Sequence, residues 1–153
     1  MQPLANSYRK TTDQLEVVFP LAINRCTDCY HVQLTQAVNP ELMFNNYLYV
    51  SGTSQTMKDH FKWFTDYTIE YYRMQNLFRP HSVLDIGCND GSQLDAFKRA
   101  QFETYGVDPA ENLYVESSKR HNVICSFWNE EVNSRITFIT RFMISVVGFY
   151  LII

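Results

Sequence analysis

The stretch VLDIGCNDGSQL, residues 83–94, passes from a short apolar run into two glycines and two acidic side chains and then becomes amphipathic. This order is typical of a buried strand that ends in a tight turn and is followed by a helix. The alternation continues, and it predicts strands at 82–86, 104–107 and 122–125 and helices at 92–100 and 111–120. Strands separated by helices of about ten residues pair in parallel through right-handed crossovers. The sequence therefore predicts an α/β fold with a partial, Rossmann-like, doubly wound parallel sheet.

The composition is that of a folded chain of about one domain. The 153 residues are 46% hydrophobic and 19% charged, and the formal net charge is −3. The 13 Lys and Arg residues are scattered, so the chain has no basic field that would attract nucleic acid. The N-terminus lacks the pattern of a signal peptide, and we expect a reducing cytoplasmic environment without disulfides.

The N-terminal region has the pattern of short strands. The runs 15–26 and 30–38 predict a β-hairpin with Cys26 and Cys29 at its tip. We expect a helix to begin after Asn39, because Asn is a favourable cap and proline is tolerated at the first helical position.

A loop and a long helix are expected to follow. Residues 47–54 form a loop punctuated by Gly and Ser, and residues 55–77 carry apolar side chains at spacings of three and four. This spacing predicts one long amphipathic helix, which Pro80 stops. The stripe of Met57, Phe61, Phe64, Thr68 and Tyr72 is expected to pack in the core.

The glycine loop after the first strand of the sheet does not match a dinucleotide site, which would show G-x-G-x-x-G. Its spacing is Asp85-x-Gly87-x-x-x-Gly91, and Asp85 and Asp90 would repel a pyrophosphate. The same carboxylates favour a cationic ligand such as S-adenosylmethionine, which has a sulfonium and an ammonium group and no phosphate. Asp108 ends the next strand, where an acidic side chain is expected to accept hydrogen bonds from both ribose hydroxyls. An NAD-type domain is a minor alternative.

Two motifs, VLDIGCNDGSQL (83–94) and YGVDPAENL (105–113), resemble the first two motifs of class I S-adenosylmethionine-dependent methyltransferases. The segments PLANSYRK, FPLAINRCTDCYHVQL and NPELMFNNYLYVSGTS, together with His60, resemble a subfamily with a small zinc-binding domain before the methyltransferase domain. That subfamily is typified by nucleotide-deoxysugar C-methyltransferases. The resemblance spans about residues 1–135. It implies methyl transfer to a ring carbon of a keto-sugar nucleotide, a small-molecule substrate, and a bound structural zinc.

The resemblance also implies a set of cofactor-binding residues. Tyr47 and Tyr49 lie, with Ser51 and Ser54, in a loop that folds over the cofactor pocket in that family, although each tyrosine has core packing as its alternative role. Cys88 is expected to pack within the glycine loop rather than to act as a nucleophile, because no base lies near it in the sequence. The predicted cofactor-binding residues are Asp85, Gly87, Cys88, Asn89, Gly91, Asp108, Pro109, Tyr47 and Tyr49. The family's main acid–base residues lie beyond the stretch that this sequence matches, so no catalytic residue is assigned.

The sequence departs from the family pattern at the zinc site. A structural zinc site needs four ligands, and only one C-x-x-C pair is present. Cys26 and Cys29 are the ligands that the resemblance implies, with His31 as a weaker third candidate. Two reduced thiols without metal are the alternative. The family's other cysteine pair lies upstream of the PLANSY segment, and we expect this chain to begin after it.

The C-terminal tail, ITFITRFMISVVGFYLII (136–153), does not resemble the family's next motif. We expect a divergent tail that forms a strand or helix against the sheet. A membrane anchor is the less favoured reading, because the uncharged part has twelve residues and about 20 are needed to span a bilayer.

These observations divide the chain into four parts and leave two functions open. The parts are a partial zinc-binding domain (1–38), a linking loop and helix (39–80), the N-terminal part of an S-adenosylmethionine-binding domain (81–135) and the apolar tail (136–153). The first function is that of a methyltransferase fragment. The alternative is a truncated, non-catalytic binding or interaction module that keeps the Rossmann-like half-domain.

Overall fold

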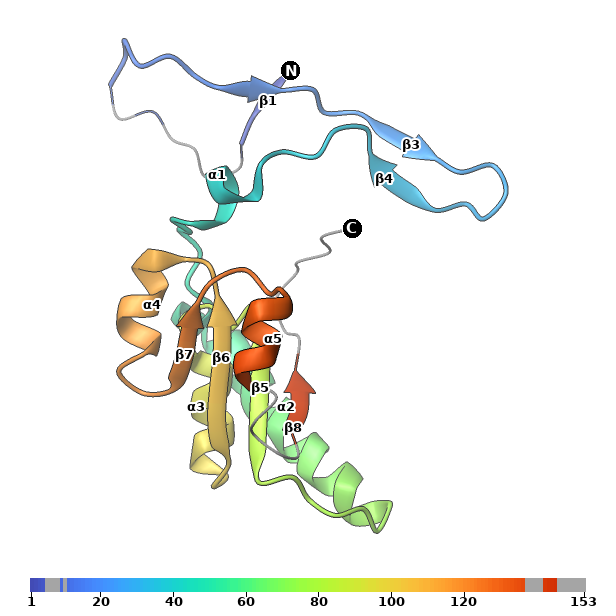
Figure 1. Ribbon diagram of the computed structural model, residues 1–153, viewed down its shortest axis with the longest axis vertical. Coiled ribbons are helices and arrows are strands. Elements are labelled where there is room, and N and C mark those ends of the chain that lie inside the picture. The colour runs from blue at the N-terminus through green and yellow to red at the C-terminus, as the bar shows by residue number, and fades with distance from the viewer. Residues whose placement is uncertain (5–8, 10, 137–141, 146–153) are drawn as a thin grey trace. The chain divides into compact units, whose positions relative to one another are not determined.

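The computed structural model describes residues 1–4, 9, 11–136 and 142–145. The chain divides into two compact units, Met1–Leu48 and Tyr49–Ile153, which we call the N-terminal and C-terminal units (Figure 1).

The N-terminal unit consists of two small antiparallel pairs and one short helix. Strand β1 (Gln2–Pro3) pairs with β2 (Val18–Phe19), and β3 (Ile23–Arg25) pairs with β4 (Val32–Leu34). Cys26 N–H donates to the His31 carbonyl at 2.8 Å and closes the second hairpin, so the predicted hairpin with the C-x-x-C pair at its tip is confirmed.

Helix α1 (Pro40–Phe44) begins as the sequence predicts. The Asn39 side chain accepts a hydrogen bond from Glu41 N–H at 3.0 Å, and Pro40 occupies the first turn. None of the described side chains of the N-terminal unit is buried, and Ile23, for example, is 67% exposed. The described part of this unit therefore has no hydrophobic core.

The C-terminal unit alternates helices and strands. Its elements are η1 (Ser51–Thr53), α2 (Gln55–Met74), β5 (Ser82–Ile86), α3 (Ser92–Arg99), β6 (Glu103–Asp108), α4 (Glu111–Ser117), β7 (Asn122–Cys125), α5 (Glu130–Ile136) and β8 (Phe142–Ser145). The predicted strands and helices between 82 and 125 are confirmed, and their bounds differ from the prediction by at most three residues.

The sheet of the C-terminal unit is parallel and has the order β7-β6-β5-β8. The chain moves outward from β5 through β6 to β7 and then crosses back to place β8 on the other side of β5. The direction of winding therefore reverses at β5, and ligands of such sheets bind at the carboxyl ends of the strands beside that reversal. This is the predicted doubly wound α/β architecture.

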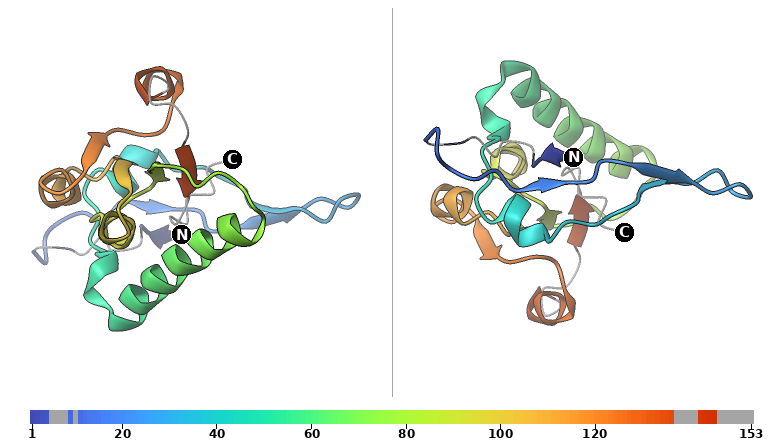
Figure 2. Two further views of the ribbon diagram at one scale, coloured as in Figure 1. Left: turned by 90° about the horizontal axis from the view of Figure 1, so that it is seen from below. Right: turned by 90° about the horizontal axis from the view of Figure 1, so that it is seen from above.

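Helices cover both faces of this sheet, with α2 and α3 on one face and α5 on the other (Figure 2). Successive residues of a strand point to opposite faces. Val83 therefore packs with Leu94 and Phe97 of α3, while its neighbour Leu84 packs with Val132 of α5. Phe97 is fully buried and lies edge-on to Phe64 and Phe102, with ring centroids 6.1 and 5.3 Å apart.

Helix α2 ends earlier than the sequence predicts. The expected helix runs to residue 77, but α2 ends at Met74, because Asn76 adopts a left-handed conformation with φ of 51°. Leu77 N–H then donates to the Tyr72 carbonyl at 3.0 Å, and Asn76 N–H donates to the Arg73 carbonyl at 3.2 Å. This pair of bonds is a Schellman motif, which ends the helix before Pro80 is reached.

Two elements follow the last predicted strand. Helix α5 was not predicted; it begins beside Asn129, whose side chain accepts a hydrogen bond from Val132 N–H at 2.9 Å. Strand β8 falls within the tail 136–153 and pairs in parallel with β5. The remainder of that tail lies outside the described residues. Among those described, no helix is long and apolar enough to cross a membrane.

Candidate functional site

Strands β5 and β6 place two carboxylates on the same face of the sheet. Asp85 is paired with Gly106, and Asp108 lies two residues further along β6, so all three point to the side that α3 covers. Asp85 and Asp108 are each only 1% exposed. The fold therefore places Asp85 and Asp108, both predicted cofactor-binding residues, at the carboxyl ends of adjacent strands.

Cys88, in the loop after β5, packs against Gly106 of β6 on the face of the sheet that α3 covers. Burial, followed by the negative charges of Asp85 and Asp108, raises the pKa of the Cys88 thiol well above its ordinary value. A Cβ atom at Gly106 would lie only 2.6 Å from the Cys88 sulfur, so the thiol fills the space that this glycine leaves. Cys88 is therefore a buried, neutral packing group with no character of a nucleophile.

Three residues of the glycine loop (87–91) adopt a left-handed backbone conformation that is unfavourable for most residue types. Gly87 and Gly91 both have φ of 80°, and Asn89 has φ of 51°. Glycine adopts this left-handed region freely, and Asn tolerates it better than most residues. Gly87 N–H donates to the Val107 carbonyl at 2.7 Å, and Gly91 N–H donates to the Cys88 carbonyl at 2.9 Å. The loop therefore curls over the end of β6 and leads directly into α3.

The Asp108 side chain accepts hydrogen bonds from the loop after β5 and from the loop after β6. One of its carboxylate oxygens accepts Asn89 N–H at 2.8 Å, and the other accepts Ala110 N–H at 2.9 Å. Burial raises the pKa of Asp108, and these two hydrogen bonds oppose the rise. Each carboxylate oxygen has a second lone pair, so the carboxylate keeps the capacity to accept further donors such as ribose hydroxyls.

A segment before α2, residues 49–52, docks on the glycine loop; we call it the strap. The Asn89 side chain accepts Ser51 N–H at 2.9 Å and donates to the Tyr49 carbonyl at 3.0 Å. Asp90 accepts Gly52 N–H at 3.1 Å. The strap is thus held through its backbone, whereas the sequence pointed to the side chain of Tyr49, which is 47% exposed.

Two further predicted residues have less defined roles. Tyr47 belongs to the N-terminal unit, where its ring lies 5.9 Å from that of Phe44, and its position relative to the glycine loop is not described. Pro109 lies between Asp108 and α4, and its carbonyl is 3.8 Å from the sulfur of Cys125. Cys125, at the carboxyl end of β7, was not among the predicted residues, although the strand prediction placed it at this edge of the sheet.

The predicted metal ligands lie at the exposed tip of the β3–β4 hairpin. Hydrogen bonds from the Cys29 and Asp28 backbone lower the pKa of Cys26. Among the residues that the structure describes, no group of three His, Cys, Asp or Glu side chains could hold a metal, so His31 does not complete a site. Two thiolates are half of the tetrahedral set that structural zinc requires. The described residues therefore do not fit a complete zinc site.

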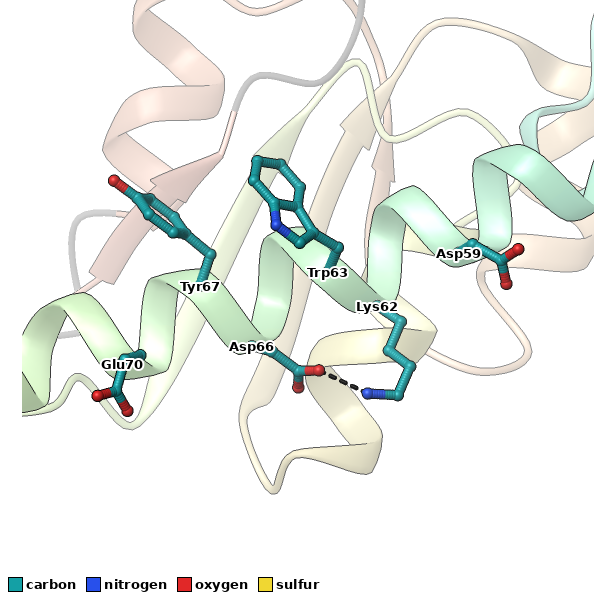
Figure 3. A pocket seen from close by; sticks show the side chains of 6 residues that line it. All are labelled: Asp59, Lys62, Trp63, Asp66, Tyr67 and Glu70. Carbon is teal, nitrogen blue, oxygen red and sulfur yellow. Dashed lines mark hydrogen bonds and ion pairs between the residues drawn. The ribbon is translucent and has the colours of Figure 1, made fainter.

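The outer face of α2 carries an open hollow of about 460 Å³ that shares no residue with the glycine loop (Figure 3). The rings of Trp63 and Tyr67 stack there at 5.6 Å, beside the ion pair between Lys62 and Asp66. The hollow has neither buried carboxylates nor a strained backbone. The carboxyl ends of β5 and β6 are therefore the stronger candidate for a binding site.

Those strand ends fit a particular kind of ligand. The glycine loop allows a ligand to approach the backbone closely, and the two carboxylates would repel phosphates. The same arrangement suits a nucleoside with a positive charge and free ribose hydroxyls, which is the chemistry of S-adenosylmethionine.

Two family models match this chain. Residues 62–143, more than half of the chain, match a family described as "Methyltransferase domain", and residues 1–44 match one described as "Putative zinc binding domain". The chain is 29% identical over 113 residues to the C-methyltransferase NovU of Streptomyces niveus. That match covers 72% of this chain and 26% of the relative, so the chain spans about a quarter of its length.

Among solved structures, the chain is similar to the plantazolicin methyltransferase BpumL. The complex of BpumL with a monoazolic desmethylPZN analog and SAH is 26% identical, with a TM-score of 0.40 over 48% of this chain and 30% of that chain. The complex with a pentazolic analog and SAH is 23% identical, with a TM-score of 0.40 over 49% of this chain and 30% of that chain.

Proposed function

Because the chain belongs to the methyltransferase domain family, we propose that it is the S-adenosylmethionine-binding part of a methyltransferase. One observation carries this proposal: Asp85 and Asp108 lie buried on one face of the sheet, at the ends of adjacent parallel strands. When bound, the cofactor supplies a methyl group on a positively charged sulfur. At 4 Å and an effective dielectric constant of about 20, a unit charge pair is worth about 4 kcal/mol. Carboxylates in this place therefore favour a sulfonium over a phosphate.

Each strand-end residue has a proposed role. Asp85 faces the cationic part of the cofactor, and Asp108 accepts the ribose hydroxyls. Gly87, Asn89 and Gly91 let the cofactor approach the backbone, and Cys88 fills the space beside Gly106. Pro109 borders the adenine, and Tyr47 and Tyr49 are further proposed contacts from the segment before α2.

The proposed substrate is a keto-deoxysugar nucleotide that is methylated on carbon. Its support is the likeness to the C-methyltransferase NovU and the family resemblance of the N-terminal segments. Methylation at such a carbon needs a base that removes a proton beside the keto group and a donor that stabilises the enolate oxygen. We assign neither role to a residue of this chain.

We further propose that Cys26 and Cys29 are zinc ligands, as the match of residues 1–44 to a zinc-binding family supports. Binding by these two thiolates alone would be weak, because an incomplete ligand set loses affinity and folding support together. No step of methyl transfer depends on this metal.

Titration calorimetry with S-adenosylhomocysteine (SAH) and with NAD tests the proposed function. We expect the chain to bind SAH and not NAD, and Asp108→Ala to weaken SAH binding at least 100-fold. Asp108→Asn keeps the size of the side chain and removes the charge, so a loss of SAH affinity in this variant is less open to explanation by unfolding. Asp59→Ala, on the outer face of α2, is the matched control and should leave affinity unchanged. Binding of NAD in preference to SAH would overturn the proposal.

A further inference from the structure

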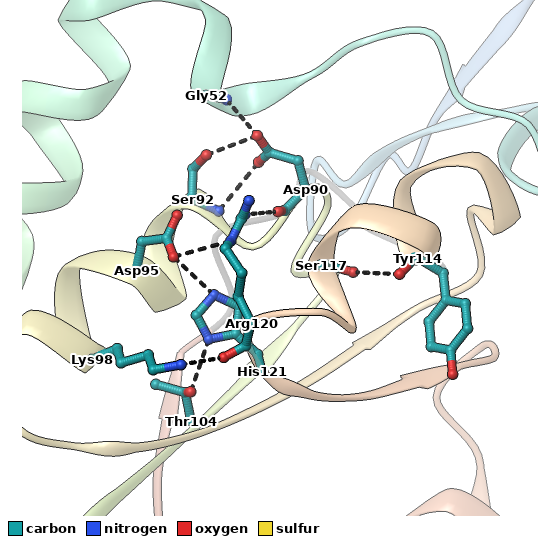
Figure 4. A network of polar contacts seen from close by, with 10 residues as sticks. All are labelled: Gly52, Asp90, Ser92, Asp95, Lys98, Thr104, Tyr114, Ser117, Arg120 and His121. Atoms are coloured by element: carbon teal, nitrogen blue, oxygen red, sulfur yellow. Dashed lines mark hydrogen bonds and ion pairs between the residues drawn. The ribbon is translucent and has the colours of Figure 1, made fainter.

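The connection between α4 and β7 contains Arg120 and His121, which no predicted role includes. We propose that these two residues are positioning residues that hold the glycine loop in its cofactor-binding conformation and so set cofactor affinity. The inference rests on the proposed function, because the ligand concerned is S-adenosylmethionine. Figure 4 shows both side chains converging on Asp95 beneath the glycine loop.

His121 packs directly against the last residue of the glycine loop. A Cβ atom at Gly91 would lie 2.8 Å from His121 Cδ2 and 3.4 Å from the Cβ of Ser117. The imidazole ring therefore fills the space beneath Gly91, and the loop cannot move toward α4 while the ring stays in place.

The ring of His121 is itself fixed at both nitrogens. Nδ1 lies 2.9 Å from the hydroxyl of Thr104, and Nε2 lies 3.1 Å from the carboxylate of Asp95. The side chain of His121 is fully buried. Because Thr104 belongs to β6 and Asp95 to the first turn of α3, the ring connects the sheet to the helix that follows the loop.

Arg120 joins the loop to the same carboxylate. Its guanidinium donates to the Asp90 carbonyl at 2.5 Å, and its Nε lies 3.2 Å from Asp95. Burial opposes the ionisation of Asp95, but the His121 hydrogen bond and the charge of Arg120 together lower the pKa of this carboxyl. The side chain of Arg120 is 40% exposed, and exposed ion pairs contribute little. We therefore expect His121 to have the larger effect.

The glycine loop is therefore held in place by contacts from two segments, the strap and the α4–β7 connection. Asn89 and Asp90 attach it to the strap through Ser51 and Gly52, and the α4–β7 connection supports it from the other side. Without His121, the space beneath Gly91 opens and the loop gains alternative conformations. A ligand that binds only one conformation then binds more weakly, in proportion to the lost population.

The first test measures SAH affinity and stability together in the full chain. His121→Ala should weaken SAH binding at least tenfold in the fraction that urea unfolding shows to be folded. Thr104→Val, a milder change, should weaken it about threefold, and Thr104→Ser, which keeps the hydroxyl, should restore it. Thr68→Val is the matched control: it removes a buried hydroxyl that, among the described residues, bonds to the Phe64 carbonyl within α2, and it should reduce stability without changing affinity. Folded His121→Ala and Thr104→Val variants with wild-type affinity would overturn the proposal.

A second readout needs no ligand. The amide hydrogens of Asn89 and Gly91 are bonded within the site, so hydrogen exchange reports how often the loop opens. His121→Ala should speed exchange at both amides, and Thr68→Val should not. If the wild-type chain fails to bind SAH, the proposed function is wrong, and exchange alone then decides the positioning role. Equal exchange in wild type and His121→Ala would contradict it.

Discussion

The glycine loop and the C-x-x-C hairpin tip are both evident as motifs in the sequence, yet the structure supports them very differently. The glycine loop has contacts from β6, from the strap and from the α4–β7 connection. The hairpin tip is closed by the backbone hydrogen bond from Cys26 N–H to the His31 carbonyl. Beside it, the guanidinium carbon of Arg25 lies 5.2 Å from the ring centre of Tyr30. A two-stranded hairpin without a buried face is marginally stable by itself. The first motif is therefore organised by contacts within its own unit, whereas no described side chain around the second is buried.

The largest expected difference between the two units is in core packing. Phe97→Ala should destabilise the C-terminal unit by about 3–5 kcal/mol, because the fully buried ring leaves a cavity. Ile23→Ala in the β3–β4 hairpin should change stability by about 0.5 kcal/mol or less, because its side chain is 67% exposed. Urea unfolding measures both. Similar losses for the two variants would mean that the hairpin side chain is buried in solution.

Thiol labelling should separate the motifs next. Cys26 and Cys29 are exposed, while Cys88 is buried and its pKa is raised well above the ordinary value, first by burial. We expect Cys88 to react on the order of 100-fold more slowly with a disulfide reagent at pH 8, since it must await local opening. The slow phase of labelling should be missing in the Cys88→Ser variant, which assigns that phase to Cys88. A slow phase that persists in this variant would contradict the assignment.

A smaller effect is expected from the glycine loop itself. Gly91→Ala should destabilise the C-terminal unit by about 1–3 kcal/mol, since the new methyl group meets His121 and the φ of 80° is unfavourable for alanine. Gly106→Ala, against Cys88, is a comparison at a glycine whose cost is steric alone. If Gly91→Ala is neutral in urea unfolding, the close packing of the loop on His121 is wrong.

The smallest expected effect is a dependence on pH. The pKa of Asp95 is lowered in the folded chain, so its contribution to stability is present above the unfolded value of about 3.9 and is lost as the pH falls below it. The pKa of Asp108 is raised, mainly by burial, so the cost of its ionisation appears on the other side, as the pH rises above the unfolded value. In Asp95→Asn, the urea midpoint should therefore fall less steeply than in the wild type as the pH drops below about 4. An unchanged acid limb would show that Asp95 is not coupled to folding.

The sequence predicts the sheet well because its signals are local. Short apolar runs mark β5, β6 and β7, with Pro80 and Gly87 on either side of β5 and Pro109 directly after β6. Asn39 with Pro40 defines the start of α1. The end of α2 also has a local signal, the left-handed Asn76. Asparagine occurs in many other conformations as well, so its presence alone does not predict where a helix ends.

The surroundings of the candidate site were not predictable in the same way. His121 meets Gly91, Asp95 and Thr104 only after the parallel strands are in register, and nothing near it in the sequence indicates burial. The strap was expected near the glycine loop by family resemblance alone. Its attachment through the backbone of residues 49–52 leaves no pattern of side chains to recognise.

The most direct test of the central claim, that the carboxyl ends of β5 and β6 form a cofactor site, is a titration of the ¹⁵N-labelled chain with SAH followed by NMR. We predict that the amide signals of Gly87, Asn89, Gly91 and Asp108 shift or exchange in a saturable way, while those of Cys26 and Cys29 stay in place. Saturable shifts confined to the Trp63–Tyr67 face of α2, or no shifts at the four strand-end residues, would contradict the account.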